Sequence, residues 1–191
     1  GLTIDGTNLN ALGGTVTISG NNAVRIVSVT GTGANTFRDL IMINGAVAGD
    51  GGAINNVSNL TIDNVTFRNN RGTGNNNGGA LYHNTGSLSI SNSTFGGTVV
   101  GDANYTGAGG GAIYIAGGTG TMTITNTTFQ NNRNAAIDNG GAIYLNGGTL
   151  SINNSTFDDN RTNNGNGGAI YQNGGTLNVG TTTGNTFTGN D

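Results

Sequence analysis

Apolar residues recur along the chain in one order and at nearly one spacing. A Gly-Gly-Ala-aliphatic element is followed by an alternating apolar pair and then by a phenylalanine, and successive elements begin 27 to 32 residues apart. Within each copy apolar and polar residues alternate, which is typical of β-strands with one buried face. The five Gly-Gly-Ala elements begin at Gly51, Gly78, Gly110, Gly140 and Gly167.

The repeat predicts an all-β fold. Three short strands per copy, separated by Gly and Asn, favour one solenoid coil per repeat with equivalent strands stacked in parallel. We therefore expect a parallel β-helix (β-solenoid) of about six or seven coils of roughly 27–32 residues. Stacking places like residues over like, so the coils should share inward columns of large apolar side chains. The predicted columns are Ile54, Leu81, Ile113, Ile143 and Ile170, and Phe67, Phe95, Phe129, Phe157 and Phe187.

The same pattern predicts the domain organisation. Residues 1–50 carry the theme in irregular coils, residues 51–191 form five regular coils, and no linker separates them, so 1–191 is expected to be one domain. The fifth copy contains a three-residue insertion at or near 180–182. We expect neither a polar cap nor an amphipathic helix at either end, although solenoids normally need caps. The chain is therefore expected to be an excerpt of a longer rod or a unit whose end coils stack on other copies.

Composition restricts the chemistry. The chain has 38 Gly, no Pro, no Cys and 8% charged residues; its six basic residues are all Arg, its nine acidic residues are all Asp, and its formal net charge is −3. A sequence of this kind forms helices poorly, and disulfides, cysteine nucleophiles and lysine Schiff bases are excluded. No apolar run approaches the roughly 20 residues of a membrane span, so this segment is not expected to insert into a membrane. The net charge argues against a nucleic-acid partner.

Asparagine recurs in two columns. Asn64, Asn92, Asn126 and Asn154 should stack at one corner of the coil, and Asn70, Asn132, Asn160 and Asn190 at another. Stacked amides can hydrogen-bond along the axis, and Asn tolerates the left-handed backbone that corners need. The second column closes a Phe-x-x-Asn motif that is broken after Phe95, where Thr98 replaces Asn. The Asn-x-Ser/Thr triplets of the first column also permit N-glycosylation, although the repeat alone explains them.

The alternation of Gly-Gly-Ala-aliphatic and Phe-x-x-Asn elements resembles the repeat of chlamydial polymorphic membrane proteins and of related giant bacterial surface proteins with right-handed parallel β-helix repeats. The resemblance covers residues 40–191 well and residues 1–39 loosely. It implies a right-handed β-helix in a secreted or autotransported adhesive surface protein.

Two side-chain rows are candidates for contacts with a partner. Tyr82, Tyr114, Tyr144 and Tyr171 each follow the inward aliphatic residue, so they should point outward and stack. Such a row suits sugar faces or a partner surface, or equally a lateral seam with rings lying over glycine. Arg71, Arg133 and Arg161 each lie four residues after a phenylalanine. Like charges stacked on neighbouring coils repel unless an anion lies between them, and Asp158 and Asp159 are the nearest anions. This column is a solvated salt-bridge edge or a strip that binds glycans or anions.

Loop length adds a third candidate. In most coils the next Gly-Gly begins ten or eleven positions after the phenylalanine, but after Phe95 it begins fifteen positions later. Loops on one edge of a rigid solenoid are where recognition is usually found. The insertion at 97–108, with Asp102 and Tyr105, is therefore the first candidate for a specific contact.

Enzyme chemistry is not indicated. The aspartates fall at different phases of the coil, Asp158 and Asp159 face opposite sides of a strand, and His83 has no evident partner. We predict no catalytic, cofactor-binding or metal-binding residue. The alternative is a carbohydrate-active, pectin lyase-like enzyme, and a minor alternative is an ice-binding solenoid that uses outward columns of small polar residues.

The predicted function is that of a non-enzymatic, extracellular structural or adhesive solenoid. It would act as a cell-surface stalk, an adhesin module or a self-assembling filament subunit. Its expected partners are further copies of itself, end to end or side by side, or glycans or proteins on a host or neighbouring cell. No nucleic acid and no cofactor is expected.

Overall fold

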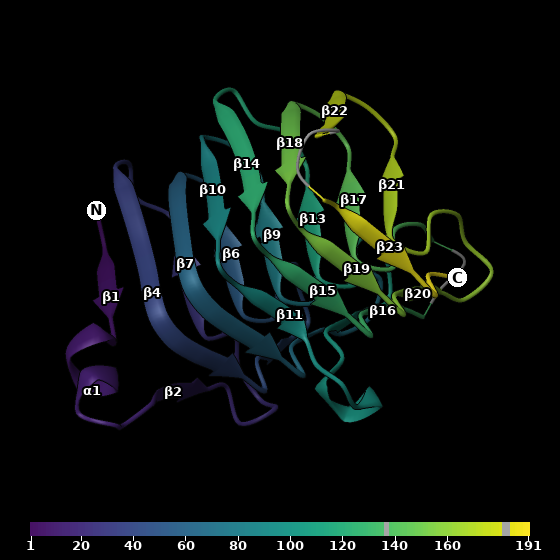
Figure 1. The fold of residues 1–191 in the computed structure, drawn as a ribbon. Coiled ribbons are helices and arrows are strands. Elements are labelled where there is room, and N and C mark those ends of the chain that lie inside the picture. The colour runs from purple at the N-terminus through teal and green to yellow at the C-terminus, as the bar shows by residue number, and fades with distance from the viewer. Residues whose placement is uncertain (136–137, 181–183) are drawn as a thin grey trace.

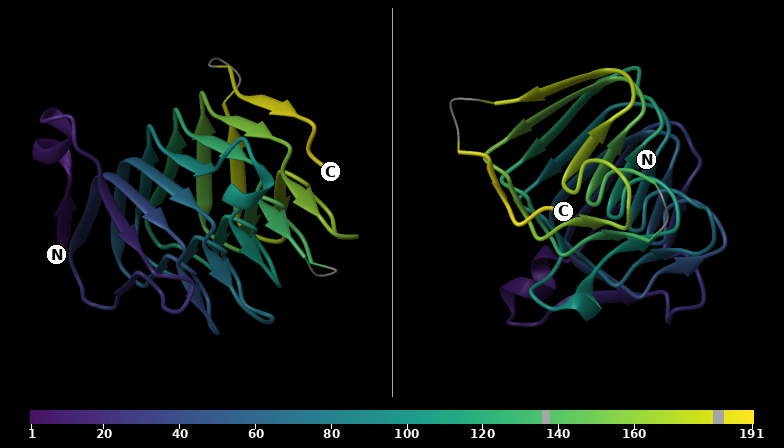
Figure 2. Two further views of the ribbon diagram at one scale, coloured as in Figure 1. Left: turned by 90° about the horizontal axis from the view of Figure 1, so that it is seen from below. Right: turned by 90° about the vertical axis from the view of Figure 1, so that its right-hand side faces the viewer.

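The chain winds into a β-solenoid of about six turns (Figure 1). The computed structural model describes residues 1–135, 138–180 and 184–191. Equivalent strands of successive turns pair in parallel. Seen from the C-terminal end, in the right panel of Figure 2, the chain runs anticlockwise as it advances towards the viewer. The solenoid is therefore right-handed, and the predicted parallel β-helix is confirmed.

Three parallel sheets run along the axis in the described part of the chain. The 12-stranded sheet contains β1 (Thr3–Asp5), β2 (Val16–Ser19), β4 (Ala34–Ile43), β7 (Asn59–Arg68), β10 (Leu88–Ser91), β11 (Thr94–Gly96), β14 (Thr121–Thr125), β15 (Thr128–Gln130), β18 (Thr149–Asn153), β19 (Thr156–Asp158), β22 (Thr176–Val179) and β23 (Thr186–Thr188). The five-stranded sheet contains β5 (Ala46–Val47), β8 (Arg71–Gly72), β12 (Tyr105–Thr106), β16 (Arg133–Asn134) and β20 (Arg161–Thr162). The six-stranded sheet contains β3 (Val27–Val29), β6 (Ile54–Asn56), β9 (Leu81–His83), β13 (Ile113–Ile115), β17 (Ile143–Leu145) and β21 (Ile170–Gln172). The two short helices are α1 (Thr7–Ala11) and η1 (Val100–Asp102).

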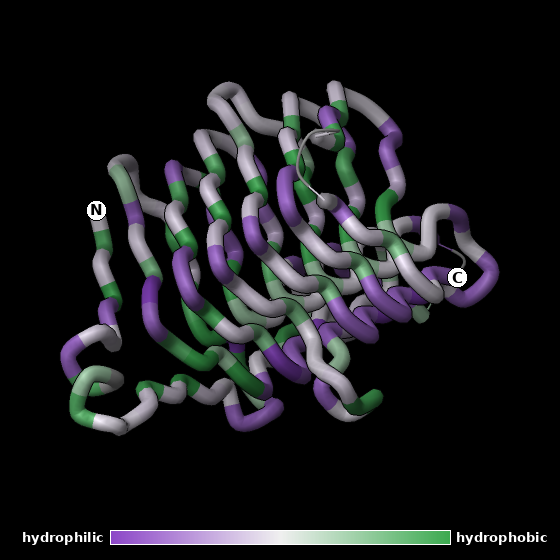
Figure 3. The backbone as a smooth tube through the Cα atoms, viewed as in Figure 1, coloured by the Kyte–Doolittle hydropathy of each residue, from purple (hydrophilic) through white to green (hydrophobic). Residues whose placement is uncertain are grey.

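The core consists of the predicted apolar columns. Ile54, Leu81, Ile113, Ile143 and Ile170 are direct partners in the six-stranded sheet. The phenylalanine rings stack with centroids 4.6, 5.0, 4.7 and 4.8 Å apart and nearly parallel planes, from Phe67 to Phe187. Figure 3 shows the apolar segments recurring at equivalent levels of successive turns. Phe95, Phe129 and Phe157 therefore lose water from both faces because the turns above and below each supply a matching ring.

The first asparagine column forms the corner that was predicted. Asn64, Asn92, Asn126 and Asn154 have φ values of 51°, 50°, 51° and 47°, in the left-handed region that Asn tolerates. Their amides also form a chain along the axis: Asn154 donates to Asn126 at 2.7 Å and Asn126 to Asn92 at 3.3 Å. In the first full turn Asp39, with φ 54°, takes this position and accepts from Asn64 at 2.6 Å.

The Gly-Gly-Ala element turns the chain from the five-stranded to the six-stranded sheet. Its first glycine has a positive φ, 70° at Gly110, which only glycine adopts without strain. Its second glycine lies against the next turn: a Cβ on Gly111 would be 2.0 Å from the carbonyl oxygen of Gly141. The alanine that follows is fully buried, as at Ala112. The element is thus a corner, as predicted, and close approach of the turns requires its second glycine.

The second asparagine column is a buried amide ladder rather than a left-handed corner. Asn132 donates from Nδ2 to the carbonyl oxygen of Phe95 at 2.9 Å and to Oδ1 of Asn160 at 2.9 Å, and its Oδ1 accepts from Asn104 at 3.0 Å. The left-handed residue is the one before it, Asn131, with φ 56°. The prediction of a corner residue was wrong here because the amide is needed inside, where it satisfies carbonyls that turn inward. The amide ladder comprises Asn70, Asn104, Asn132, Asn160 and Asn190.

The ladder also repairs the motif that is broken after Phe95. Asn104, and not Thr98, occupies the equivalent position: it donates to the carbonyl oxygen of Phe67 at 2.9 Å and accepts from Asn70 at 3.0 Å. Residues 97–103 therefore leave the turn and return to it without a change of register. In the fifth copy the predicted insertion at 180–182 lies outside the described residues except for Gly180, and Phe187 again pairs with Phe157.

The N-terminal turns differ from the prediction in one respect. A five-residue helix, α1, joins β1 to β2, whereas no helix was expected near either end. The helix covers little, because Leu9 is 48% exposed and Leu12, just after it, is 84% exposed. In the described residues no helix combines the length and apolar character that crossing a membrane requires.

We expect Asn132→Ala to lower the free energy of unfolding by about 3 kcal/mol, because three buried hydrogen bonds are lost at a site without water. Urea unfolding followed by circular dichroism measures this change. Asn75→Ala, at an exposed asparagine of a loop, is the matched control and should change stability by less than about 0.5 kcal/mol. Equal losses for the two variants would contradict a structural role for the ladder.

Candidate functional site

One outward row on the five-stranded sheet combines three arginines with a tyrosine. Arg71 of β8 pairs with Tyr105 of β12, Tyr105 with Arg133 of β16, and Arg133 with Arg161 of β20. We call these four residues the Arg–Tyr strip. The arginines were predicted to stack on neighbouring coils, but Tyr105 separates Arg71 from Arg133. Only Arg133 and Arg161 are direct neighbours, so the repulsion between like charges is smaller than expected.

The amide ladder positions the strip. Four strands of this sheet, β8, β12, β16 and β20, begin directly after a ladder asparagine, and each has only two residues. Alternation then turns the first residue outward and the second inward, and the second is buried at Gly72, Thr106 and Asn134. Tyr105 was predicted to lie in the inserted loop, but it lies in β12 because Asn104 has already restored the register.

The three arginines have different surroundings. Arg71 donates from Nε and one terminal nitrogen to Oδ1 of Asn69 at 3.2 and 3.0 Å. Arg161 lies 3.8 Å from a carboxylate oxygen of Asp159, and both side chains are about half exposed, so this ion pair contributes little to stability. Nε of Arg133 is buried and has no acceptor among the described residues.

Of the two aspartates predicted to balance the arginines, only one does so. Asp159 faces Arg161 at 3.8 Å. Asp158 instead accepts a hydrogen bond from Nε2 of Gln130 at 2.9 Å. The two carboxylates therefore bind different neighbours, because Asp159 adopts the left-handed backbone, with φ 51°, directly after the strand.

The inserted loop stands beside the strip. It spans residues 97–103, shorter than the predicted 97–108, and contains η1. Its tip is apolar and exposed: Val99 is 57% and Val100 is 59% exposed, and Figure 3 shows this green tip clear of the turns. The carbonyl oxygen of Asp102 accepts a hydrogen bond from the backbone N–H of Asn69 at 3.0 Å, which holds the loop against the preceding turn.

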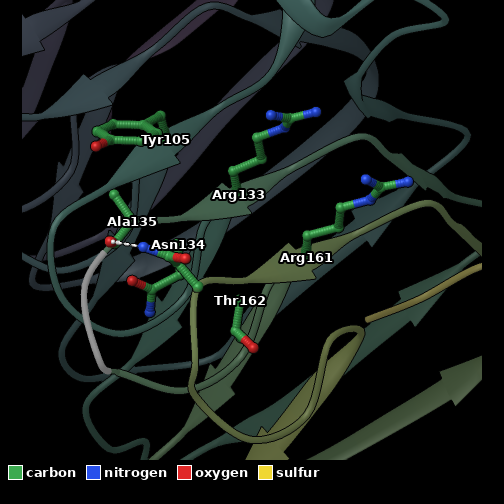
Figure 4. Close-up of a pocket in the computed structure, with 7 residues that line it drawn as sticks. Tyr105, Arg133, Asn134, Ala135, Arg161 and Thr162 are labelled. Carbon is green, nitrogen blue, oxygen red and sulfur yellow. Dashed lines mark hydrogen bonds between the residues drawn. The ribbon is translucent and has the colours of Figure 1, made fainter.

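Two cavities adjoin the strip and share Tyr105 and Arg133. The first, of about 330 Å³, lies between the loop and the strip. The second, of about 290 Å³, continues past Arg133 to Arg161 and is drawn in Figure 4. There the side chains of Arg133 and Arg161 extend side by side with their guanidinium groups at the same end, and the Tyr105 ring points the other way. Asn163 closes one edge by donating to the carbonyl oxygen of Ala135 at 3.1 Å.

The predicted tyrosine row forms on the outer face of the six-stranded sheet. Centroids of Tyr82, Tyr114, Tyr144 and Tyr171 lie 5.6, 4.8 and 5.1 Å apart in sequence order. The rings are half buried, and a Cβ on Gly109 would lie 2.6 Å from the Tyr144 ring. The rings thus lie over glycine, one of the arrangements predicted for them. Burial, with the neighbouring tyrosines Tyr144 and Tyr82 and two aspartates, raises the pKa of Tyr114 to about 12.

Asn56 and His83 form a buried polar pair inside the solenoid that was not predicted from the sequence. His83 is fully buried; its Nδ1 accepts from Nδ2 of Asn56 at 2.9 Å, and its Nε2 lies 3.3 Å from the carbonyl oxygen of Gly86. Burial lowers the pKa of His83, and the bond to Gly86 opposes that shift. The pair occupies one inward column between apolar residues Val29 and Ile115, so only the register reveals that the two side chains meet.

The outward columns of small polar residues are also in register. Thr61, Ser89, Thr123 and Ser151 are successive partners in the 12-stranded sheet. In the next column Ser91 donates to Asp63 at 2.7 Å, so its hydroxyl is already occupied. The ice-binding reading of these columns stays a prediction.

Part of the repeat region matches the model of a known protein family. The Chlamydia polymorphic membrane protein repeat matches residues 154–173, which contain Phe157, Asn160 and the Gly-Gly-Ala-Ile element from Gly167. Over these residues the chain is similar to the polymorphic membrane protein repeat. The matched segment runs from one left-handed corner through the ladder to the next corner, and the other turns repeat it in register. The polymorphic membrane protein repeat and the solenoid together fit a structural or surface repeat protein. Neither the curated proteins nor the solved structures contain a significant match.

The raised pKa of Tyr114 predicts how stability depends on alkaline pH. The folded chain keeps a proton that an unfolded tyrosine releases near pH 10. The stabilisation is therefore complete below about pH 10 and is lost as the pH rises from about 10 towards 12. Tyrosinate absorbance should show a late-titrating group in the folded chain that Tyr114→Phe removes and that denaturant abolishes. A wild-type titration curve identical to that of the denatured chain would contradict the stack.

Proposed function

We propose that this chain is a non-enzymatic, extracellular module of a surface protein, and that it makes adhesive contacts on one side of a rigid solenoid. The observation that carries the proposal is the position of the loop at 97–103. It leaves the turn directly beside the Arg–Tyr strip, and the ladder continues beneath it through Asn104. An insertion that costs the scaffold no hydrogen bond is free to serve recognition.

Rigidity supports this proposal. Each turn is held by backbone pairing in three sheets and by the amide ladder, so the strip and the loop keep fixed positions without a ligand. A pre-organised surface loses little conformational entropy on binding. The polymorphic membrane protein repeat supports placing the chain at a cell surface. The partner would be a glycan or a protein on a neighbouring or host cell.

Self-association is the second candidate. Phe187 stacks on Phe157 at 4.8 Å and is 47% exposed, so a further turn in the same register, from this chain or another copy, would bury it. Sedimentation velocity at rising concentration separates the two candidates, because stacking copies lengthen and monomers do not.

The adhesive contact is tested with beads that carry the purified chain and settle on glycan-bearing cultured cells. We expect Val99→Ser/Val100→Ser to lower adherence several-fold, because the apolar tip loses its contact area. Leu12→Ser, which removes a still more exposed apolar residue from the N-terminal segment, should leave adherence unchanged.

Antibody labelling of intact cells that produce the protein tests its location. We expect labelling without permeabilisation. Labelling only after permeabilisation, or equal adherence of beads carrying the wild type and the loop variant, would contradict the proposal.

A further inference from the structure

We infer that the Arg–Tyr strip and its two cavities bind a linear acidic polysaccharide that lies along the solenoid axis. Carboxylate or sulfate groups of the sugar chain pair with the arginines, and a sugar ring packs on Tyr105. The inference rests on the proposed adhesive function and names the chemical class of its partner.

Local charge is the first argument. Although the chain has a net charge of −3, the described residues that line the two cavities include three arginines and no aspartate. Asp102 belongs to the adjacent loop, but its carboxylate faces inward: a Cβ on Gly97 would lie 2.4 Å from its Oδ2. Asp159 is the one carboxylate paired with the strip, at 3.8 Å and half exposed, so a ligand anion can displace it at small cost.

Spacing along the axis is the second argument. Strands of neighbouring turns lie about 4.8 Å apart, which is close to the length of one hexose in an extended chain. Arg133 and Arg161 are one step apart, and Arg71 and Arg133 are two steps apart with Tyr105 between them. A sugar chain parallel to the axis therefore meets a guanidinium at one- and two-residue intervals. Guanidinium groups bind carboxylate and sulfate oxygens in a bidentate manner, which suits such periodic anions.

The surroundings of the arginines are the third argument. Nε of Arg133 is buried without an acceptor among the described residues, so no protein acceptor holds the guanidinium group through Nε. The cavity beside it is walled by the Tyr105 ring and by Val100 of the loop. Carbohydrate recognition typically combines polar groups for hydroxyl and acidic oxygens with an aromatic face for the C–H surface of the ring.

Other polyanions fit this strip less well. Single-stranded nucleic acid is usually held by successive aromatic rings on which bases stack, whereas the strip offers one ring among three arginines. A single ring among three arginines therefore favours a sugar chain, which needs one aromatic face for a ring and guanidinium groups for its acidic oxygens.

The experiment measures binding of the full chain to immobilised polygalacturonate, heparin, neutral dextran and a single-stranded oligonucleotide by biolayer interferometry. We expect binding to polygalacturonate or heparin that weakens with salt, and none to dextran; the two acidic probes distinguish carboxylate from sulfate as the preferred anion. Arg133→Gln should weaken binding about tenfold, because Arg133 serves both cavities. Arg161→Gln, at an exposed side chain, should weaken it several-fold and carries no risk to folding.

Arg38→Gln is the matched control, because it removes the same charge from another face, where Arg38 pairs with Asp5 at 2.9 Å. It should leave the affinity unchanged, and Tyr105→Ser should weaken binding without altering its salt dependence. Equal effects of Arg38→Gln and Arg133→Gln, or tighter binding of the oligonucleotide, would overturn the inference. Shortening of the polygalacturonate during the assay would also overturn it, in favour of a carbohydrate-active enzyme.

The two proposals fail separately. Surface labelling and loop-dependent adherence with no polysaccharide binding would remove this inference and leave the adhesive function standing. Polysaccharide binding by a chain found only inside cells would do the reverse.

Discussion

Buried amides decide where each turn of this solenoid lies relative to the next. At the end of every phenylalanine strand the backbone turns inward, and its carbonyl needs a donor where no water reaches. Asn132 and Asn160 provide these donors to Phe95 and Phe129, and each amide also bonds the amide of the next turn. Because an unsatisfied buried carbonyl costs about 1–3 kcal/mol, a turn that places its asparagine one residue early or late is strongly disfavoured. In the turn before Phe67 the phenylalanine is replaced by Met42, and there the ladder ends: Gly45 holds the equivalent position and donates its backbone N–H to Oδ1 of Asn70 at 2.9 Å.

This constraint separates the scaffold from its loops. The outward residues of the five-stranded sheet follow a ladder asparagine directly, so their positions do not depend on what the chain does before it. The excursion at 97–103 therefore changes the surface without shifting Tyr105 out of line with Arg71 and Arg133. One rigid frame thus carries both the row of arginines and the loop that forms a wall beside it. Recognition surfaces on other solenoids arise in the same way, from loops on a repeating core.

The sequence predicted the residues that recur from copy to copy, but not the roles of the residues that an insertion displaces along the chain. Stacked Phe67, Phe95 and Phe129 followed from spacing alone, because a period near 28 residues is visible in any linear reading. The role of Asn104 could not be predicted in this way, because six extra residues separate it from the position three residues after Phe95. In the sequence Thr98 holds that position. Tyr105 was assigned to the loop for the same reason. The corner at Asn154 and the stacking of Asn160 on its counterparts were predicted correctly. The left-handed residue of the second corner is Asp159, one position before Asn160, because sequence does not tell which of two adjacent residues that tolerate this backbone adopts it.

The interior pair of Asn56 and His83 marks a second limit. Neither residue recurs at the equivalent position of the other turns, and only the pairing of β6 with β9 brings the two side chains together. The candidate site shows the same limit. Three arginines were identified by their common offset from phenylalanine, whereas the first cavity depends on the path of the loop at 97–103, which has no counterpart in the other turns where the structure describes them.

A deletion series across the loop tests the ladder most directly. Removing residues 97–102 together with Ala103→Asn leaves Asn104 three residues after Phe95, as Asn70 is after Phe67. Removing only residues 97–101 and keeping Ala103 places Ala103 three residues after Phe95 and Asn104 four residues after. The account predicts that the first variant keeps the wild-type free energy of unfolding in urea and that the second loses roughly 2 kcal/mol or more. Equal stability of the two variants would contradict the claim that the amide ladder sets the register.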